Sequence, residues 1–222
     1  MDSIIYFILI LLIPLAAQFF VSSSYGKYKK QENSRRITGY DIARKMLDNN
    51  GLKDMYVVIT DGTMSDHYDP KRKTVRLSDD VYNGTSIASL AIAAHETGHA
   101  LQDKDGYLYM KIRSFIFPIV SLGTKFSYIV LLIGFLFQMI DLIWLGILLV
   151  GLGFIFQVVT LPVEFNASSR AKKEIEKYNF ASSEDLIGVD KMLKAAAYTY
   201  VAGVLSSALE LLRLISIVSG RD

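Results

Sequence analysis

The stretch Ala93-Ala94-His95-Glu96-Thr97-Gly98-His99-Ala100-Leu101-Gln102 contains two of the three histidines in a chain of 222 residues. Residues four apart lie on one face of an α-helix, so a helical stretch lets His95 and His99 bind one metal ion. Glu96 lies beside that pair, where its carboxylate can take a proton from a water molecule. The alternative is that the two imidazoles only fill a helix face, although the small alanines around them offer no polar partner.

The residues on both sides predict that this stretch is a helix. Gly84-Thr85-Ser86 offers hydroxyl caps ahead of an apolar, alanine-rich run, and Asp103-Lys104-Asp105-Gly106 is a typical helix end. On a helix, His-Glu-x-x-His is the pattern of zinc metallopeptidases. The sequence therefore predicts one Zn²⁺ per chain, held in part by His95 and His99, with Glu96 as the general base.

The composition points to a membrane protein. Hydrophobic residues make up 51% of the chain, and its mean hydropathy of +0.31 is high for a soluble domain. These residues are concentrated in blocks, so we expect the lipid bilayer as a partner. A net charge of +2 without a basic, aromatic-rich stretch argues against nucleic acid. The absence of cysteine excludes disulfides, thiolate ligands and cysteine nucleophiles.

The first apolar segment, residues 4–21, is just long enough to span a bilayer. No basic residue precedes it and no clear cleavage site follows, so we interpret it as a retained anchor; Val21-Ser22-Ser23-Ser24 keeps a cleaved signal peptide open as the alternative. Fifteen of the 24 basic residues lie between Lys27 and Arg113. The positive-inside rule places that region in the cytoplasm and the N-terminus outside, which predicts a multi-pass protein of the plasma membrane.

A small β element is expected ahead of the histidine helix. Residues 38–50 have the cap, the apolar face and the Asn-Gly end of a helix. Residues 55–60 and 74–78 read as short strands rich in β-branched residues. Between them, Asp66-His67-Tyr68-Asp69-Pro70 is rich in turn-forming residues and is expected to be a loop.

Two further apolar segments, residues 116–137 and 142–161, predict a transmembrane hairpin. The break between them has no Lys or Arg, as expected for an outside loop. Lys125 lies inside the first of these segments and must face the bundle, a polar cavity or the interface. Residues 195–218 are either a fourth span or a helix packed against the bundle, in which Glu210 and Arg213 can pair.

Together these segments predict a mainly α integral membrane protein with a zincin-like metallopeptidase core, a small β element and about four transmembrane helices. The expected parts are an N-terminal anchor, a cytoplasmic part with the histidine helix, the hairpin, cytoplasmic helices with a third zinc ligand, and a last transmembrane or bundle-packed helix. Their boundaries are 1–24, 25–110, 111–162, 163–194 and 195–222.

A catalytic zinc needs three protein ligands and one open position. The candidates for the third ligand are His67 and Glu164. Glu164 follows directly where the hairpin returns to the cytoplasm, and the small Ala167 and Ala171 would let its helix approach the histidine helix closely. A new helix is expected to begin at Pro162 and to run to about Tyr178. The alternative for Glu164 is that it only interacts with the dipole of the first turn of that helix.

The motifs Asp66-His-Tyr-Asp-Pro70, His95-Glu-Thr-Gly-His99-Ala-Leu-Gln102 and Leu161-Pro-Val-Glu-Phe-Asn-Ala-Ser168 resemble the YugP family of bacterial membrane zinc metallopeptidases. The HtpX and CAAX-prenyl-protease group is more distantly similar. The resemblance implies that His95, His99 and Glu164 are the zinc ligands and Glu96 the base. In the distant group an aspartate four residues after the ligand glutamate orients a ligand histidine. Here that position is Ser168, so we expect another orienting group, Asn166 or a backbone carbonyl.

These features predict an endopeptidase that hydrolyses a peptide or membrane-protein substrate at the cytoplasmic membrane face. Zinc would activate the water and polarise the carbonyl, and Glu96 would move the proton. His67 is the first candidate for a donor to the oxyanion, ahead of Tyr68 and Arg170, unless it is only a surface turn residue. The substrate is expected to pair as an added strand along Thr74–Leu77.

Two other functions remain open on sequence alone. One is a zinc hydrolase that acts on lipid or another non-protein amide. The other is a non-catalytic membrane scaffold or partner-binding protein that keeps a structural metal site. Structural zinc usually has four protein ligands, and His67 together with His95, His99 and Glu164 would make such a set.

Overall fold

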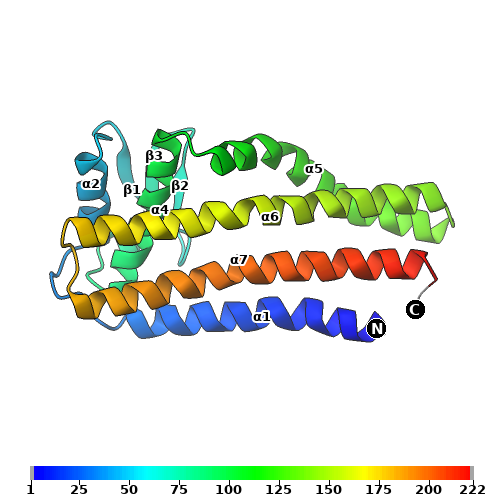
Figure 1. Ribbon diagram of the computed structural model, residues 1–222, viewed down its shortest axis with the longest axis horizontal. Coiled ribbons are helices and arrows are strands. Elements are labelled where there is room, and N and C mark those ends of the chain that lie inside the picture. Colours follow the sequence, from blue (N-terminus) through cyan, green and yellow to red (C-terminus); the bar gives the residue numbers. More distant parts are fainter. Residues whose placement is uncertain (1–2, 221–222) are drawn as a thin grey trace. The chain divides into compact units, whose positions relative to one another are not determined.

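A computed structural model of the chain describes residues 3–220 as seven helices and three strands (Figure 1). In chain order these are α1 (Ser3–Tyr28), α2 (Gly39–Asn49), β1 (Tyr56–Thr60), β2 (His67–Asp69), β3 (Thr74–Ser78), α3 (Asp79–Tyr82), α4 (Ile87–Lys104), α5 (Leu108–Leu136), α6 (Ile140–Lys177) and α7 (Ser183–Val218). The mainly α fold with a small sheet that the sequence predicts is confirmed.

The chain forms two compact units. The first, here called the membrane unit, comprises Met1–Gln18, Leu108–Pro162 and Tyr198–Asp222. The second, called the site unit, comprises Phe19–Tyr107 and Val163–Ala197. Helices α1, α6 and α7 each contribute residues to both units.

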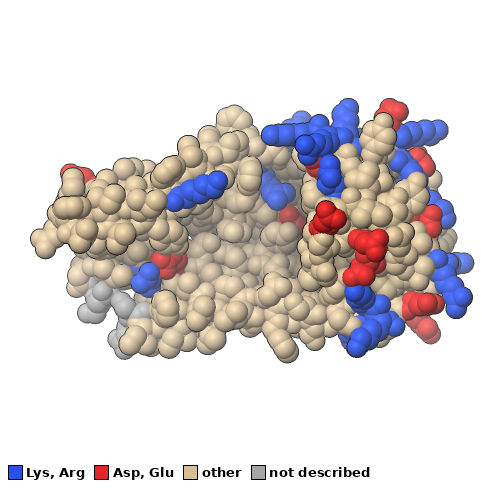
Figure 2. Space-filling model, turned by 180° about the vertical axis from the view of Figure 1, so that it is seen from behind, with Lys and Arg blue, Asp and Glu red and all other residues tan. Residues whose placement is uncertain are grey.

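The membrane unit is built from α5 and from parts of α1, α6 and α7. These are the four helices in the described chain that are long and apolar enough to cross a membrane, which agrees with the expected number. Leu131, Ile143 and Leu214 belong to a buried cluster that joins α5, α6 and α7. Most of the exposed side chains around it are apolar, Lys125 being an exposed exception, and Figure 2 shows this part of the molecule with few charged side chains. Such a surface suits lipid contact.

Two glycines let α5 and α6 pack closely within the hairpin. A Cβ added to Gly134 would lie 2.8 Å from Ile143 Cγ1, and one added to Gly146 would lie 2.5 Å from Leu131 Cγ. Both distances are shorter than ordinary carbon contacts of about 3.5–4.0 Å. Small residues at such contacts are the usual device for helix association in membranes.

The sheet of the site unit corrects two predictions. His67–Asp69 forms strand β2 instead of a loop, pairing antiparallel with β3 from His67 opposite Arg76 to Asp69 opposite Thr74. Strand β1 pairs parallel with the other side of β3, so the order is β1-β3-β2. Residues 74–76 of the central strand β3 are therefore paired on both sides, with β1 and with β2. The expected substrate pairing along Thr74–Leu77 is wrong, because β1 and β2 already occupy both sides of β3 over most of that stretch.

The core of the site unit lies between the sheet, α2 and α4. Thr38 caps α2 through a capping box with Asp41, and Ile42 and Met46 from its apolar face are fully buried. Ser86 caps α4 by accepting a hydrogen bond from the Ser89 amide, as the hydroxyl-rich start predicts. Alanines allow α4 to be buried on most sides, which places its histidines inside the unit.

Helix α6 differs from the expectation of a new helix at Pro162. It runs unbroken from Ile140 to Lys177 with Pro162 inside it. Proline removes one backbone donor, a loss that helices in membranes tolerate when neighbouring groups compensate. Glu164 therefore lies in the interior of a long helix, and the alternative that assigned it to a first helical turn is wrong.

Candidate metal centre

Helix α4 presents His95 and His99 on one face, one turn apart. Their ring centroids are 4.8 Å apart, with the rings nearly perpendicular. The side chains are 12% and 9% exposed, respectively. Both imidazoles are thus held inside the site unit, where they need polar partners.

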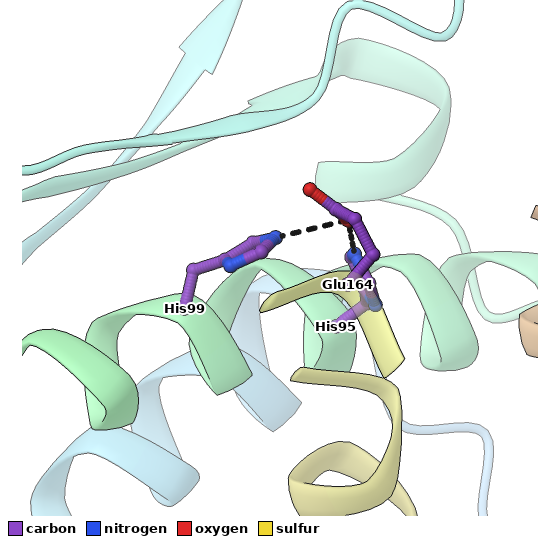
Figure 3. A group of neighbouring side chains, drawn as sticks. All are labelled: His95, His99 and Glu164. Carbon is purple, nitrogen blue, oxygen red and sulfur yellow. Dashed lines mark hydrogen bonds and ion pairs between the residues drawn. The ribbon is translucent and has the colours of Figure 1, made fainter. Parts of the chain in front are cut away.

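Glu164 supplies such a partner from α6. Its Oε2 atom lies 3.3 Å from His95 Nε2 and 3.5 Å from His99 Nε2, and its side chain is 2% exposed (Figure 3). The three side chains converge although Glu164 is 65 residues beyond His99 in the sequence. Contact between α4 and the 163–177 part of α6 is what brings them together.

That contact depends on small residues in both helices. A Cβ added to Gly98 would lie 2.5 Å from the Ala167 carbonyl oxygen. Ala167 and Ala171 are fully buried, in agreement with their expected place in the helix contact. Gly98 stands between the two histidines, and its lack of a side chain brings the backbone of α6 close enough for Glu164 to reach both rings.

The three side chains fit a divalent metal of the zinc type. Their ligand atoms all lie within 4.8 Å of one another. Zinc bonds of about 2.0–2.2 Å at tetrahedral angles place neighbouring ligand atoms about 3.3–3.6 Å apart. The two distances from Glu164 Oε2 to the imidazole nitrogens match that spacing. Two histidines and one glutamate also leave one position of a four-coordinate ion open.

The remaining imidazole nitrogens have partners that hold the ring orientations. Ser168 Oγ lies 3.1 Å from His95 Nδ1, and Gln102 Oε1 lies 2.9 Å from His99 Nδ1. Gln102 is fully buried and donates from Nε2 to the Val163 carbonyl at 2.7 Å and to Asn166 Oδ1 at 3.0 Å. The expectation that a residue other than Ser168 orients the histidine is therefore wrong for His95, and Asn166 contacts Gln102 and Arg170.

Glu96 is half-buried beside the two histidines. Burial raises the pKa of its carboxyl group, and the charges of Glu164 and Asp66 act in the same direction, opposed by His95 and His99. Burial alone would lower the pKa of His99, but its hydrogen bond with Glu164 and the charge of Glu96 raise it. A carboxylate with a raised pKa accepts a proton more readily.

The other candidate residues lie apart from this group. Among residues 3–220 the cluster of possible metal ligands consists of His95, His99 and Glu164, without His67. The His67 side chain is exposed and its Nδ1 contacts the Ser65 carbonyl at 2.8 Å. Its neighbour Tyr68 is buried. Successive side chains of a strand point to opposite faces, so His67 points away from the core that Tyr68 enters.

Tyr68 and Arg170, the weaker candidates for a donor, are both engaged in hydrogen bonds. The Tyr68 hydroxyl donates to Asp103 Oδ2 at 2.8 Å. Arg170 Nε donates to Asn166 Oδ1 at 2.8 Å, and its Nη1 pairs with Asp105. Burial and the bond to Asp103 raise the pKa of Tyr68, so its hydroxyl stays protonated. These bonds tie β2 and α6 to the C-terminal end of α4.

The four apolar helices and the cluster of two histidines and a glutamate are those of a zincin-like membrane protein. The chain belongs to the family described as "Putative neutral zinc metallopeptidase", which matches residues 3–219. It is 48% identical over 207 residues to the "Putative membrane protease YugP" of Bacillus subtilis (strain 168), covering 93% of this chain and 92% of that protein. A comparison with solved structures gave no match. The family membership confirms the resemblance drawn from the motifs.

Proposed function

We propose that this chain is a zinc-dependent endopeptidase held in the plasma membrane, with His95, His99 and Glu164 as the metal ligands. The proposal rests on the buried convergence of these three side chains, in which Glu164 Oε2 lies at zinc-like distances from both imidazoles, and on the carboxylate of Glu96 beside them. Zinc bound there would lower the pKa of a water molecule and polarise the carbonyl of the bond to be cut.

Side chains of this protein would carry out the proton transfers and hold the ligands in place. The Glu96 carboxylate takes the proton of the attacking water and passes it to the leaving amine. Ser168 and Gln102 hold the two imidazoles so that Nε2 of each faces Glu164. We assign no role to His67, because it is exposed and lies outside the cluster.

The same geometry favours a catalytic over a structural metal site. A structural zinc usually has four protein ligands, and the fourth histidine or carboxylate required is missing from the cluster found among residues 3–220. A scaffold with a closed site would use His67, which points elsewhere. A catalytic zinc site in a hydrolase therefore accounts for a set of three ligands, whereas a structural zinc site in a scaffold does not.

We infer that the site unit faces the cytoplasm. Fifteen of the 24 basic residues lie between Lys27 and Arg113, and the loop between α5 and α6 has none, which is the asymmetry of the positive-inside rule. Blue side chains gather over the site unit in Figure 2. The proposed substrates are proteins or peptides that reach the membrane from that side.

The test of the proposed reaction is Glu96→Gln in the purified full-length chain. Removing the base should lower the cleavage of casein and of a membrane-protein substrate by about 10²–10⁴-fold, while zinc stays bound because no ligand changes. Glu176→Gln, at an exposed position of α6, is the matched control and should cleave normally. Unchanged cleavage by Glu96→Gln would exclude Glu96 as the base. If the wild type hydrolysed a lipid amide but did not cleave proteins, the chain would instead be a zinc hydrolase that acts on non-protein amides.

A further inference from the structure

The site unit contains a polar cavity that is separate from the metal centre. It has a volume of about 320 Å³ and lies between the C-terminal end of α4 and the 166–174 part of α6, and Asn50, which follows α2, completes the lining. Every lining residue belongs to the site unit. Neither Glu96 nor any of the proposed zinc ligands is among them, so the proposed peptidase reaction does not use this cavity.

Three basic side chains from two helices line the cavity. Lys104 comes from the last turn of α4. Arg170 and Lys173 are three residues apart in α6 and therefore lie on the same face of that helix. Two acidic side chains, those of Asp105 and Glu174, also line the cavity. The lining thus carries one more positive than negative charge.

Both carboxylates of the lining already have partners. Asp105 pairs with Arg170 Nη1, and Glu174 Oε2 accepts a hydrogen bond from the side-chain amide of Asn50. Glu174 Oε1 also lies 3.9 Å from the ammonium group of Lys177. A metal cation would have to break these contacts and approach three basic groups, so it is an unfavourable occupant.

The basic groups, by contrast, keep donors without partners in the part of the chain that the structure describes. Arg170 donates from Nε and Nη1 to neighbouring side chains, which fixes its guanidinium plane and leaves Nη2 unused. Lys104 donates to the Asn50 carbonyl at 2.7 Å, which is one of the three hydrogen bonds that an ammonium group can make. Lys173 is exposed, and its ammonium group makes no ion pair or hydrogen bond within residues 3–220.

Charge and size decide among the possible occupants. Arginine and lysine donors held close together favour an anion. A phosphate group presents acceptor oxygens in several directions, whereas the two oxygens of a carboxylate lie in one plane. Donors that reach the cavity from two helices therefore suit phosphate better. A single turn of α-helix, about 10 Å wide and 5.4 Å long, occupies more than about 400 Å³, so a helical protein segment does not fit.

We propose that this cavity binds a phosphate group, which accepts hydrogen bonds from Arg170 Nη2 and from the ammonium groups of Lys104 and Lys173. Inorganic phosphate and the head group of a phospholipid share this chemistry. Because the lining excludes the metal ligands, phosphate binding does not depend on the proposed peptidase activity.

The experiment measures binding of radiolabelled inorganic phosphate to the purified full-length chain in an uncharged detergent. We expect saturable binding that acetate at the same ionic strength does not displace. Glycerol 3-phosphate, a small analogue of a lipid head group, distinguishes the sources: stronger competition than by unlabelled phosphate supports a phospholipid head group, and weaker competition supports free phosphate. Equal displacement by acetate, or the absence of saturable binding, would overturn the proposal.

Variants of the basic residues locate the site. Arg170→Gln should weaken phosphate binding about tenfold or more, because hydrogen bonds to charged groups are strong. Lys173→Gln breaks no ion pair, so it keeps the test decisive if the arginine variant fails to fold, and it should weaken binding about threefold or more. Lys191→Gln is the matched control, because this exposed lysine of α7 does not line the cavity.

Two results for these variants would overturn the proposal. One is phosphate binding by Arg170→Gln and Lys173→Gln equal to that of Lys191→Gln. The other is phosphate binding that is lost in Glu164→Ala but kept in the cavity variants, because this would place the anion on the metal.

Discussion

The buried side chain of Gln102 makes three hydrogen bonds beside the metal centre. Its amide is fully buried, accepts from the His99 ring and donates to the Val163 carbonyl and Asn166. One side chain thus joins the ligand histidine of α4 to the segment of α6 that carries Glu164. We infer that Gln102 fixes the ring of His99 and also the distance between the two ligand-bearing segments.

Replacing Gln102 with Ala should therefore weaken zinc binding without removing a ligand. Loss of an outer partner of a metal ligand typically costs about 10–100-fold in affinity, and we expect a decrease of that size in a competition titration with a chromophoric chelator. Gln138→Ala, in the exposed loop between α5 and α6, should bind zinc as the wild type does. Equal affinities of the two variants would show that His99 keeps its orientation without Gln102.

For single residues, the sequence predicts well which side chains lie together on one helix face. The spacing of His95 and His99 needs only the helical period, and Gln102, three residues after His99, could have been found by the same rule. The expected topology made Glu164 a candidate for the third ligand, but only the family resemblance favoured it over His67. His67 was misplaced because Asp66 and Pro70 suggested a loop, whereas pairing with β3 makes residues 67–69 a strand.

Among the elements, the contact between α4 and α6 decides whether a metal site can form. It depends on the absence of a side chain at Gly98, where an added Cβ would meet the Ala167 carbonyl at 2.5 Å. That neighbour is backbone inside a helix, so it cannot rotate away. The consequence of a larger residue is a displacement of the whole segment that carries Glu164.

Gly98→Ala should therefore lower both stability and zinc affinity, although alanine is the better helix former. We expect a loss of about 1–3 kcal/mol in the free energy of unfolding, as for other overpacked cores, measured by denaturant titration in detergent. Gly26→Ala in α1 is the matched control, since no atom lies within 4 Å of its added Cβ. If both variants were as stable as the wild type, close approach at Gly98 would not be required.

The elements also show where prediction from sequence fails. Helix periodicity and caps located α2 and α4, because these signals are local. Strand order depends on pairing between distant residues, and nothing in residues 74–78 alone indicates a central strand. Pro162 suggested a helix start, but the long apolar segment before it and the helical residues after it form one continuous α6.

For the whole molecule, the proposed orientation places the site unit in the cytoplasm and the α5–α6 loop outside. The chain has no cysteine, so single cysteines can report the topology without background. In intact cells, a membrane-impermeant maleimide should label Gln138→Cys, whereas Arg72→Cys should react only after permeabilisation. Both positions are exposed. The reverse pattern would place the site unit outside and contradict the positive-inside argument.

Zinc binding by Glu164 together with His95 and His99 can be measured as the metal content of the purified full-length chain. We expect about one zinc per chain in the wild type and in Glu176→Ala, an exposed position on the same helix. In Glu164→Ala the content should fall close to zero after dialysis, because two histidines alone hold zinc weakly. Full zinc occupancy in Glu164→Ala would show that Glu164 is not a zinc ligand.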